Sequence, residues 1–243
     1  RGKQFVIVGD EKQLSPNDLY QVKWDSDNPD DAIELDVESI LDLASIYLPQ
    51  KSLTQHYRSE SLELMDFSNR MFYNSKLQIL PHFNKIQTKV PPITFIKVDG
   101  IWEKNQNEIE ADKVVEEVLS LIKQKEKSIG VVTFNVKQQL LIQDKFEEIC
   151  IENKIKIPEE FFIKNIENVQ GDERDNIIFS ITYAPTVSGK LNIKFGSLNM
   201  IKGENRLNVA VTRARKKIII ISSILPQDLK VEKVKNEGPK FFK

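Results

Sequence analysis

The sequence predicts an α/β fold in which helices flank a parallel β-sheet. Short continuous runs of apolar and β-branched residues, typical of strands buried on both faces, recur along the chain. Segments with apolar residues at helical spacing separate these runs, an order typical of parallel sheets. The expected strands are 4–8, 93–98, 129–133, 176–182 and 218–222, and the expected helices are 36–48, 59–72, 108–123 and 136–149.

The helices are identified by their caps and their apolar stripes. Asp36 is the expected N-cap of the first helix, because its carboxylate can accept from the free backbone N–H groups of the first turn. The helix at 108–123 shows the clearest periodicity. Its stripe repeats at i, i+4 and i+7 and consists of Ala111, Val115, Val118, Leu119 and Ile122. Residues 17–36 are polar and acidic and predict a loop without metal-ligand spacing.

Composition narrows the class of protein. The 243 residues are 40% hydrophobic and 29% charged, as in an ordinary globular protein of one large or two small domains. The formal net charge of −1 means that any nucleic-acid contact must come from local basic patches. One cysteine, Cys150, excludes an internal disulfide framework, and with His56 and His82 as the only histidines no metal site is expected.

The apolar runs are too short to span a bilayer, and no secretory signal opens the chain, so we expect no membrane association and a cytoplasmic, reducing location. The chain starts at Arg1 and runs almost at once into the strand-like FVIVG. Because a domain rarely begins in mid-strand, we expect the chain to be a fragment of a longer polypeptide.

The stretch RLNVAVTRARKK, residues 206–217, combines an apolar stripe with five arginine and lysine residues whose role needs explaining. Read as a helix, it places Arg206 and Arg213 along one border of the stripe and Arg215 elsewhere. Arginines at such a border suit the binding of an anion in a cleft. The alternative is that both extend along the edge of an ordinary helix with their charges in water. The stripe itself consists of Leu207, Ala210, Val211 and Ala214.

Four more stretches carry polar residues beside expected strands or helices. In parallel α/β sheets ligands bind at the carboxyl ends of the strands, so the residues that follow strands are the first candidates. The stretches are GDEKQLSP (9–16), HYRS (56–59), IGVVTFNVKQQ (129–139) and VQGDERD (169–175). Taken alone, GDEKQLSP reads as a plain loop and VQGDERD as a solvated turn.

Together and in this order, these motifs resemble those of superfamily 1 helicases, in the branch that includes RNA-surveillance and related DNA helicases. GDEKQLSP resembles motif III, HYRS motif IV, VQGDERD motif V and RLNVAVTRARKK motif VI, and TFNVKQQ resembles the segment that contacts the nucleic-acid backbone. The resemblance runs from Phe5 to about Ser223. It implies a RecA-like P-loop NTPase-type lobe, although the phosphate-binding G-x-x-x-x-G-K-[ST] and the acidic Mg²⁺ motif are absent from this chain.

The resemblance also implies a division of the chain. Residues 1–20 correspond to the end of a first RecA-like lobe, and residues 21–50 to a connecting loop and helix. The second lobe covers 51–225, and 226–243 are expected to form a tail or linker. The P-loop and the Mg²⁺ ligands are expected upstream of Arg1, so this chain contributes half of an ATP site and is expected to be inactive alone.

The resemblance implies roles at the nucleotide. Arg58 and Arg213 correspond to arginine fingers that stabilise charge on the transferring phosphoryl group, and Gln13 to a sensor of the γ-phosphate. Tyr57 corresponds to the residue that lies against adenine. Arg206 either joins the pocket or ties motif VI to its own lobe. The remaining pocket residues implied are Gln170, Gly171 and Glu173, with Glu173 near the ribose hydroxyls.

On the nucleic-acid side, the resemblance implies contacts from Thr133, Phe134 and Asn135, with Ser180 and Thr182 as weaker candidates. The alternative for Phe134 is core packing rather than base stacking, and for Ser180 and Thr182 it is a plain strand position.

These expectations give the principal hypothesis for function. The chain is the second motor lobe of an ATP-dependent helicase or translocase that uses ATP and Mg²⁺. Its expected partners are single-stranded DNA or RNA and the upstream lobe of the same polypeptide. The competing hypothesis is a degenerate, non-catalytic lobe that binds nucleic acid or protein. A small-molecule kinase is disfavoured, since it would need the missing phosphate loop.

Overall fold

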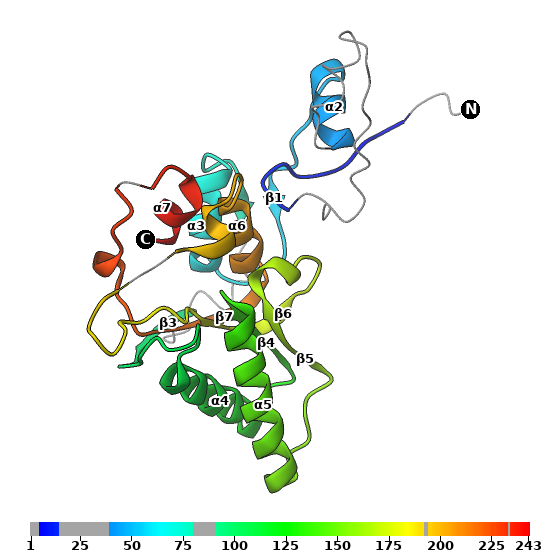
Figure 1. Ribbon diagram of the computed structural model, residues 1–243. Helices are drawn as coiled ribbons and strands as arrows, with labels where there is room; N and C mark the ends of the chain where they lie inside the picture. The colour runs from blue at the N-terminus through cyan, green and yellow to red at the C-terminus, as the bar shows by residue number, and fades with distance from the viewer. Residues whose placement is uncertain (1–4, 15–38, 80–90, 192–193, 233) are drawn as a thin grey trace, which may run out of the picture. The chain divides into compact units, whose positions relative to one another are not determined.

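The computed structural model describes residues 5–14, 39–79, 91–191, 194–232 and 234–243 (Figure 1). The chain divides into two compact units, Arg1–Thr54 and Gln55–Lys243. The expected cap Asp36 and the acidic loop at 17–36 lie outside the described residues. No helix in the described ranges is both long and apolar enough to cross a membrane.

The first unit contains one described helix, α2 (Ile40–Tyr47). It begins later than expected because Ser39 is the N-cap, with its side chain accepting from the backbone N–H of Asp42 at 3.1 Å. The strand expected at 4–8 is wrong for the described residues 5–8, which form no strand and expose Phe5, Val6 and Val8. A strand is stabilised by hydrogen bonds to a neighbouring strand, and the described part of this unit contains no strand that could pair with residues 5–8.

The second unit is built on a sheet of five parallel strands, which confirms the predicted fold class. Their spatial order is β3-β7-β6-β4-β5, so β6 and β7 lie side by side near the middle. The expected strands at 93–98, 129–133, 176–182 and 218–222 are confirmed to within a few residues. The strands are β3 (Ile93–Lys97), β4 (Ser128–Thr133), β5 (Glu160–Asn165), β6 (Arg174–Ser180) and β7 (Ala214–Ser222).

Strand β5 is absent from the sequence prediction. Its sequence, EFFIKN, mixes charged with aromatic residues, and only two of its six positions are buried. It lies at the edge of the sheet and pairs with β4 alone. An edge strand faces water along one side and therefore lacks the continuous apolar pattern that identifies β4, where all six positions are buried.

Helices cover both faces of this sheet (Figure 1). On one face lie α4 (Glu108–Lys123) and α5 (Val136–Asn153), whose apolar sides form a continuous core with Ile178, Ile219 and Ile221. On the other lie α3 (Leu62–Phe72), α6 (Glu204–Val211) and α7 (Glu237–Phe242). The run of four isoleucines in β7 agrees with helices on both faces, because successive side chains of a strand point into opposite layers and both layers are apolar.

The helix expected over 206–217 is shorter than its apolar stripe suggests. Helix α6 ends at Val211, Thr212 is its C-cap, and β7 begins at Ala214. Arg206 and Arg213 therefore do not share one helix border, and this expectation is wrong. The physical reason is that the strand's backbone is paired with β6 back to Ala214, so its extended conformation overrides helical periodicity.

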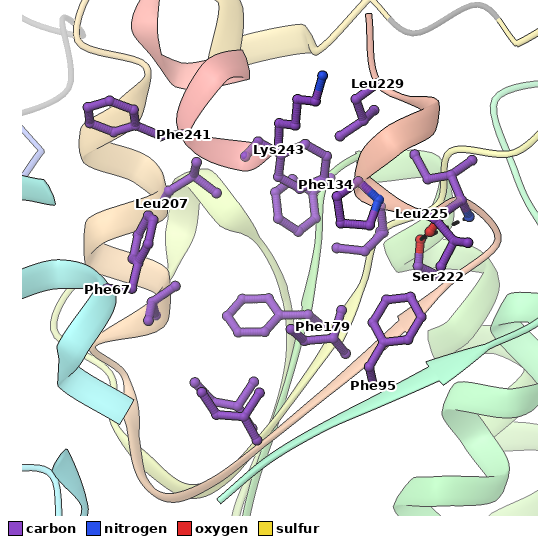
Figure 2. Close-up of a pocket in the computed structure, with 18 residues that line it drawn as sticks. Phe67, Phe95, Phe134, Phe179, Leu207, Ser222, Leu225, Leu229, Phe241 and Lys243 are labelled. Atoms are coloured by element: carbon purple, nitrogen blue, oxygen red, sulfur yellow. Dashed lines mark hydrogen bonds between the residues drawn. The ribbon is translucent and has the colours of Figure 1, made fainter. Parts of the chain in front are cut away.

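The segment 226–243, expected to be a tail or linker, packs on the second unit. Its helix α7 places Phe241 against Phe72 at 5.4 Å between ring centroids and Phe242 against Phe134 at 5.0 Å. Between this segment and the sheet lies an apolar cavity of about 320 Å³ (Figure 2). Phe134 lines this cavity, as do Phe67 on α3 and Leu207 on α6.

Shortening a buried side chain of the central strand β6 tests which residues contribute most to the stability of the fold. Ile178 is completely buried between β4 and β7 and α4, so Ile178→Ala should lower the free energy of unfolding by about 2–5 kcal/mol in urea denaturation. Ile151→Ala is the control, because Ile151 is 78% exposed on α5, and its change should stay within about 0.5 kcal/mol. Equal losses in both variants would contradict this placement of the core.

Candidate functional site

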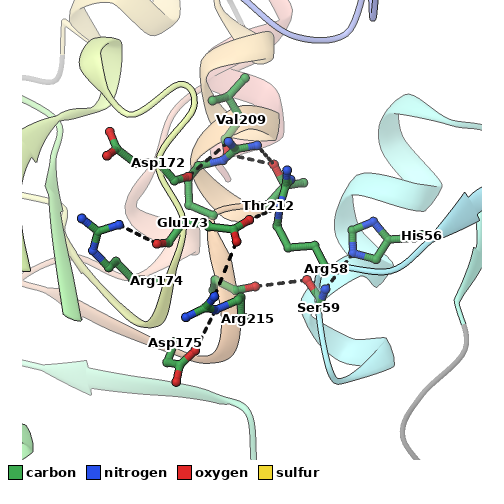
Figure 3. A network of polar contacts seen from close by, with 12 residues as sticks. His56, Arg58, Ser59, Asp172, Glu173, Arg174, Asp175, Val209, Thr212 and Arg215 are labelled. Carbon is green, nitrogen blue, oxygen red and sulfur yellow. Dashed lines mark hydrogen bonds and ion pairs between the residues drawn. The ribbon is translucent and has the colours of Figure 1, made fainter. Parts of the chain in front are cut away.

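Three motif segments meet where β6 and β7 begin (Figure 3). The backbone N–H of Arg174 donates to the carbonyl of Arg213 at 3.0 Å, which joins the 169–175 loop to the end of α6. The loop after Tyr57 joins both through Ser59, whose hydroxyl donates to the carbonyl of Ala214 at 3.1 Å. These residues lie at the amino ends of the strands, whereas the sequence analysis expected ligand-binding residues first at the carboxyl ends.

Arg58 and Glu173 form the ion pair that crosses this junction. The Nε of Arg58 donates to the Glu173 carboxylate at 2.7 Å, and both side chains remain partly exposed. Ion pairs of this exposure contribute little to folding stability, because water and salt screen them. The pair is therefore better suited to presenting charge to a ligand than to holding the fold.

Arg213 lies beside this pair and is only 3% exposed. Its guanidinium donates to the carbonyls of Val209 at 2.8 Å and Asp172 at 3.2 Å and to the hydroxyl of Thr212 at 3.0 Å. Burial, and next the positive charge of Arg58, lower the pKa of Arg213 to about 10. The side chain therefore stays charged at neutral pH, held by neutral acceptors at its direct contacts.

Arg215 is a member of the cluster that the sequence reading missed. It contacts Oε1 of Glu173 at 3.5 Å, whereas Arg58 binds Oε2, and it pairs with Asp175 at 2.7 Å. Lys216 also pairs with Asp175. The helical reading pointed Arg215 away from Arg213. In an extended chain, residues two apart lie on the same side. Because β7 begins at Ala214, Arg213 and Arg215 are two apart at the start of extended chain, which the helical reading did not anticipate.

Tyr57 and His56 precede the arginine in the HYRS motif. Tyr57 is 89% exposed, and its ring stacks on that of His56 with centroids 6.4 Å apart. The Nε2 of His56 accepts from the backbone N–H of Ser59 at 2.9 Å, which closes the loop. Burial and the charge of Arg58 lower the pKa of His56, so its neutral form is favoured. The loop thus fixes the backbone while leaving one aromatic face available.

The turn before β6 brings Gln170 and Gly171 to the surface next to this cluster. Gly171 has φ +86°, a left-handed conformation that favours glycine, and a Cβ built there would meet nothing within 4 Å. Glycine is required here by backbone conformation rather than by lack of space. Lys164 holds the turn from β5 by an ion pair of 2.6 Å with Asp172.

Two further residues predicted at the nucleotide are Gln13 and Arg206. Gln13 belongs to the first unit, where its Nε2 donates to the Asp10 carboxylate at 2.8 Å. Arg206 lies on α6, and its Nε is buried without a hydrogen-bond partner among the described residues. Within the same residues, no group of three or more His, Cys, Asp or Glu side chains could hold a metal ion.

The residues predicted to contact nucleic acid lie at the opposite, carboxyl edge of the sheet. Thr133 and Ser180 are completely buried, and Phe134 packs against Phe179 and Phe242 in the apolar layer. Asn135 is the N-cap of α5: its side chain accepts from the backbone N–H of Lys137 at 2.7 Å. In this structure these side chains hold the edge together.

A buried polar network runs beneath this edge, and sequence reasoning missed it. At its centre is Glu110 on α4, which accepts from the hydroxyl of Ser180 at 2.7 Å and from the backbone N–H of Thr182. Asn107 and Gln138 extend the network to α5, with the backbone N–H of Asn107 donating to Gln138 at 2.8 Å. Burial raises the pKa of Glu110 to about 8. The signal available was an N-cap residue followed three positions later by a glutamate.

Comparison with known proteins agrees with this arrangement. The family model described as "AAA domain" matches residues 38–224. The chain belongs to this family. Its motifs and relatives identify the second unit as a RecA-like lobe of the superfamily 1 helicases, which confirms the resemblance seen in the sequence.

The relatives are named as helicases. The chain is 37% identical to "Uncharacterized ATP-dependent helicase MG140 homolog" of Mycoplasma pneumoniae, over 90% of this chain and 21% of that protein. It is 35% identical to "Uncharacterized ATP-dependent helicase MG140" of Mycoplasma genitalium, over 94% of this chain and 22% of that protein. With "Probable helicase senataxin" of Mus musculus it shares 26% identity, over 92% of this chain and 9% of that protein. The chain thus spans about a fifth of the length of its two mycoplasma relatives.

The titration of Glu110 gives this helicase lobe a defined pH dependence. Between an ordinary carboxyl pKa near 4.5 and the folded value of about 8, the folded state holds a proton that the unfolded state has lost. The contribution of Glu110 to stability is therefore complete below pH 4.5 and is lost as the pH rises toward 8. Glu110→Gln, which cannot ionise, should flatten the fall of the unfolding free energy over this range in urea titrations.

The comparison is made against wild type at each pH, so that other titrating groups cancel. Identical pH slopes for wild type and Glu110→Gln would contradict the assignment of a protonated, buried Glu110.

Proposed function

We propose that this chain is the second motor lobe of an ATP-driven superfamily 1 helicase or translocase. The observation that supports this is the meeting of Arg58, Arg213 and Glu173 at the start of β6 and β7. Three segments far apart in the sequence are brought together there by backbone hydrogen bonds, and they carry the residue types that bind and neutralise a polyphosphate.

The charges favour an anion at this place. Arg58 and Arg213 repel each other, which is one reason why the pKa of Arg213 is lowered. Glu173 offsets part of this repulsion through its pair with Arg58, but the other oxygen of the same carboxylate also pairs with Arg215. A negative group beside Arg58 and Arg213 relieves the excess positive charge, and in this proposal that group belongs to the triphosphate of ATP.

Each residue has a proposed role. ATP, when bound, supplies a γ-phosphoryl group that water attacks in line, and Arg58 and Arg213 act as arginine fingers that stabilise the charge developing on it. Exposed Tyr57 offers its ring to the adenine, and Glu173 exchanges between Arg58 and the ribose hydroxyls. The free left-handed turn at Gly171 allows close backbone approach, which fits a nucleotide beside it. Gln170 and Arg206 complete this half of the pocket.

The other half of the site is proposed to come from a first RecA-like lobe of the same polypeptide. Gln13 senses the γ-phosphate from that side, and Mg²⁺ is held by carboxylates of that lobe. Single-stranded DNA or RNA binds along the carboxyl edge formed around Thr133, Phe134, Asn135 and Ser180, where backbone contacts suit either strand. The location that fits this activity is the cytoplasm.

Removal of the arginines tests the site. In the full-length protein, Arg58→Ala or Arg213→Ala should lower nucleic-acid-stimulated ATP turnover by on the order of 10³–10⁵, because each deletes a charge that stabilises the transition state. The measurement is steady-state ATP hydrolysis with oligo(dT) or oligo(U), and circular dichroism verifies folding.

Arg70→Ala is the matched control, since Arg70 is an exposed arginine on α3 that pairs with the exposed Asp66 and should leave turnover unchanged. Near-normal turnover in both finger variants would exclude the proposed roles. If wild type shows no hydrolysis above background with either strand, the chain is better described as a non-catalytic binding lobe.

The isolated chain provides a second test. The 243 residues contain no G-x-x-x-x-G-K-[ST] to hold the phosphates, so the chain alone should hydrolyse ATP no faster than the buffer does. Turnover that co-elutes with the chain through successive columns and disappears in Arg213→Ala would contradict the half-site proposal.

A further inference from the structure

The loops at the carboxyl edge of the sheet are held together by Glu110, a residue that belongs to none of the sequence motifs. Glu110 lies at the third position of α4, where a glutamate usually turns back to the N-cap backbone N–H to form a capping box. Here that N–H, of Asn107, is already bound to Gln138 on α5. One carboxylate oxygen of Glu110 therefore binds the exit of β6, and the other accepts from the Nδ2 of Asn107 at 3.3 Å.

The residue that Glu110 holds is strained. Thr182 has φ +73°, a conformation that β-branched residues rarely adopt. Its backbone N–H donates to Glu110, and its carbonyl accepts from the Nδ2 of Asn107 at 3.2 Å. Both peptide groups that flank the Cα of Thr182 are therefore held by the first turn of α4. Such strain persists only where the surroundings impose it.

The same network reaches three further strand exits at this edge, those of β3, β4 and β7. The Nδ2 of Asn107 also donates to the hydroxyl of Ser223 at 2.8 Å, just after β7, and that hydroxyl accepts from the backbone N–H of Gly100 at 3.2 Å, after β3. Gln138 donates to the carbonyl of Asn107 at 3.0 Å, which holds the start of α5 after β4. Four strand exits are thus joined through three fully buried side chains, Asn107, Glu110 and Gln138.

We propose that Glu110 is a positioning residue for single-strand binding, which holds the exits of β6 and β7 and the start of α5 in one arrangement without touching the strand. This inference rests on the proposed function, since it assigns the carboxyl edge to nucleic acid. It also explains why Ser180, expected to contact the strand, is wholly buried: its hydroxyl is a donor to Glu110, and the backbone of the edge is left to meet the phosphates.

The test compares strand binding with stability in the full-length protein. Glu110→Ala removes the acceptor for Ser180 and Thr182, so the exit of β6 is no longer held in its binding arrangement, and the Kd for a fluorescent oligo(dT) or oligo(U) should weaken by about tenfold or more. The KM for ATP at saturating strand should stay at the wild-type value. Glu110→Gln retains the oxygen that accepts from both groups and should restore most of the affinity.

Val118→Ala is the matched control, because it truncates a buried residue of the same helix outside the network and lowers stability without altering the edge. If Glu110→Ala does not fold, Asn107→Ser takes its place: serine keeps the N-cap but lacks the Nδ2 donor to Thr182 and Ser223. Weakened binding in the network variant, with normal binding in Val118→Ala, supports the proposal.

Equal affinity in the wild-type and network variants, or equal weakening in Val118→Ala, would overturn it and leave a purely structural role for Glu110. If the wild-type protein binds neither strand, the proposed function itself fails, and the positioning role fails with it.

Discussion

The pairing of β6 with β7 is the constraint on which the rest of this lobe depends. These neighbouring parallel strands enter the sheet together, with Arg174 opposite Ala214, so the loop that precedes one and the helix end that precedes the other must meet. That register brings Glu173 to Arg215 and the carbonyl of Asp172 to Arg213. A shift of the register would separate both contacts at once.

The third segment depends on the same strands. The loop that carries Tyr57 and Arg58 has no long element to fix it, and it is held by hydrogen bonds to the carbonyls of Ala214 and Arg215. Because these carbonyls belong to the first residues of β7, the position of Arg58 follows from the sheet as well. An arginine cluster of this kind needs a rigid base, since its mutual repulsion would otherwise spread the side chains apart.

The two edges of the sheet use polar residues in opposite ways. At the amino edge the groups are charged, partly exposed and shared among competing partners, which suits the exchange of one partner for a ligand. At the carboxyl edge Asn107, Glu110 and Gln138 are buried and satisfied by neutral groups, which suits rigidity. Strand β6 spans both, from Arg174 to Ser180, so the proposed nucleotide and strand sites share one element of the core.

The sequence by itself determined the fold class, the helices α3, α4 and α5 and four of the five strands of the main sheet, because apolar periodicity reports which side of each segment is buried. It also determined the motifs and hence the family. The tertiary structure decided those features that depend on contacts between segments far apart in the chain. The Arg213 segment reads as helix by periodicity, yet pairing with β6 makes a strand begin at Ala214. Strand β5 and the contacts of Arg215 and Glu110 likewise arise between residues far apart in the chain, where only the packed sheet brings the partners together.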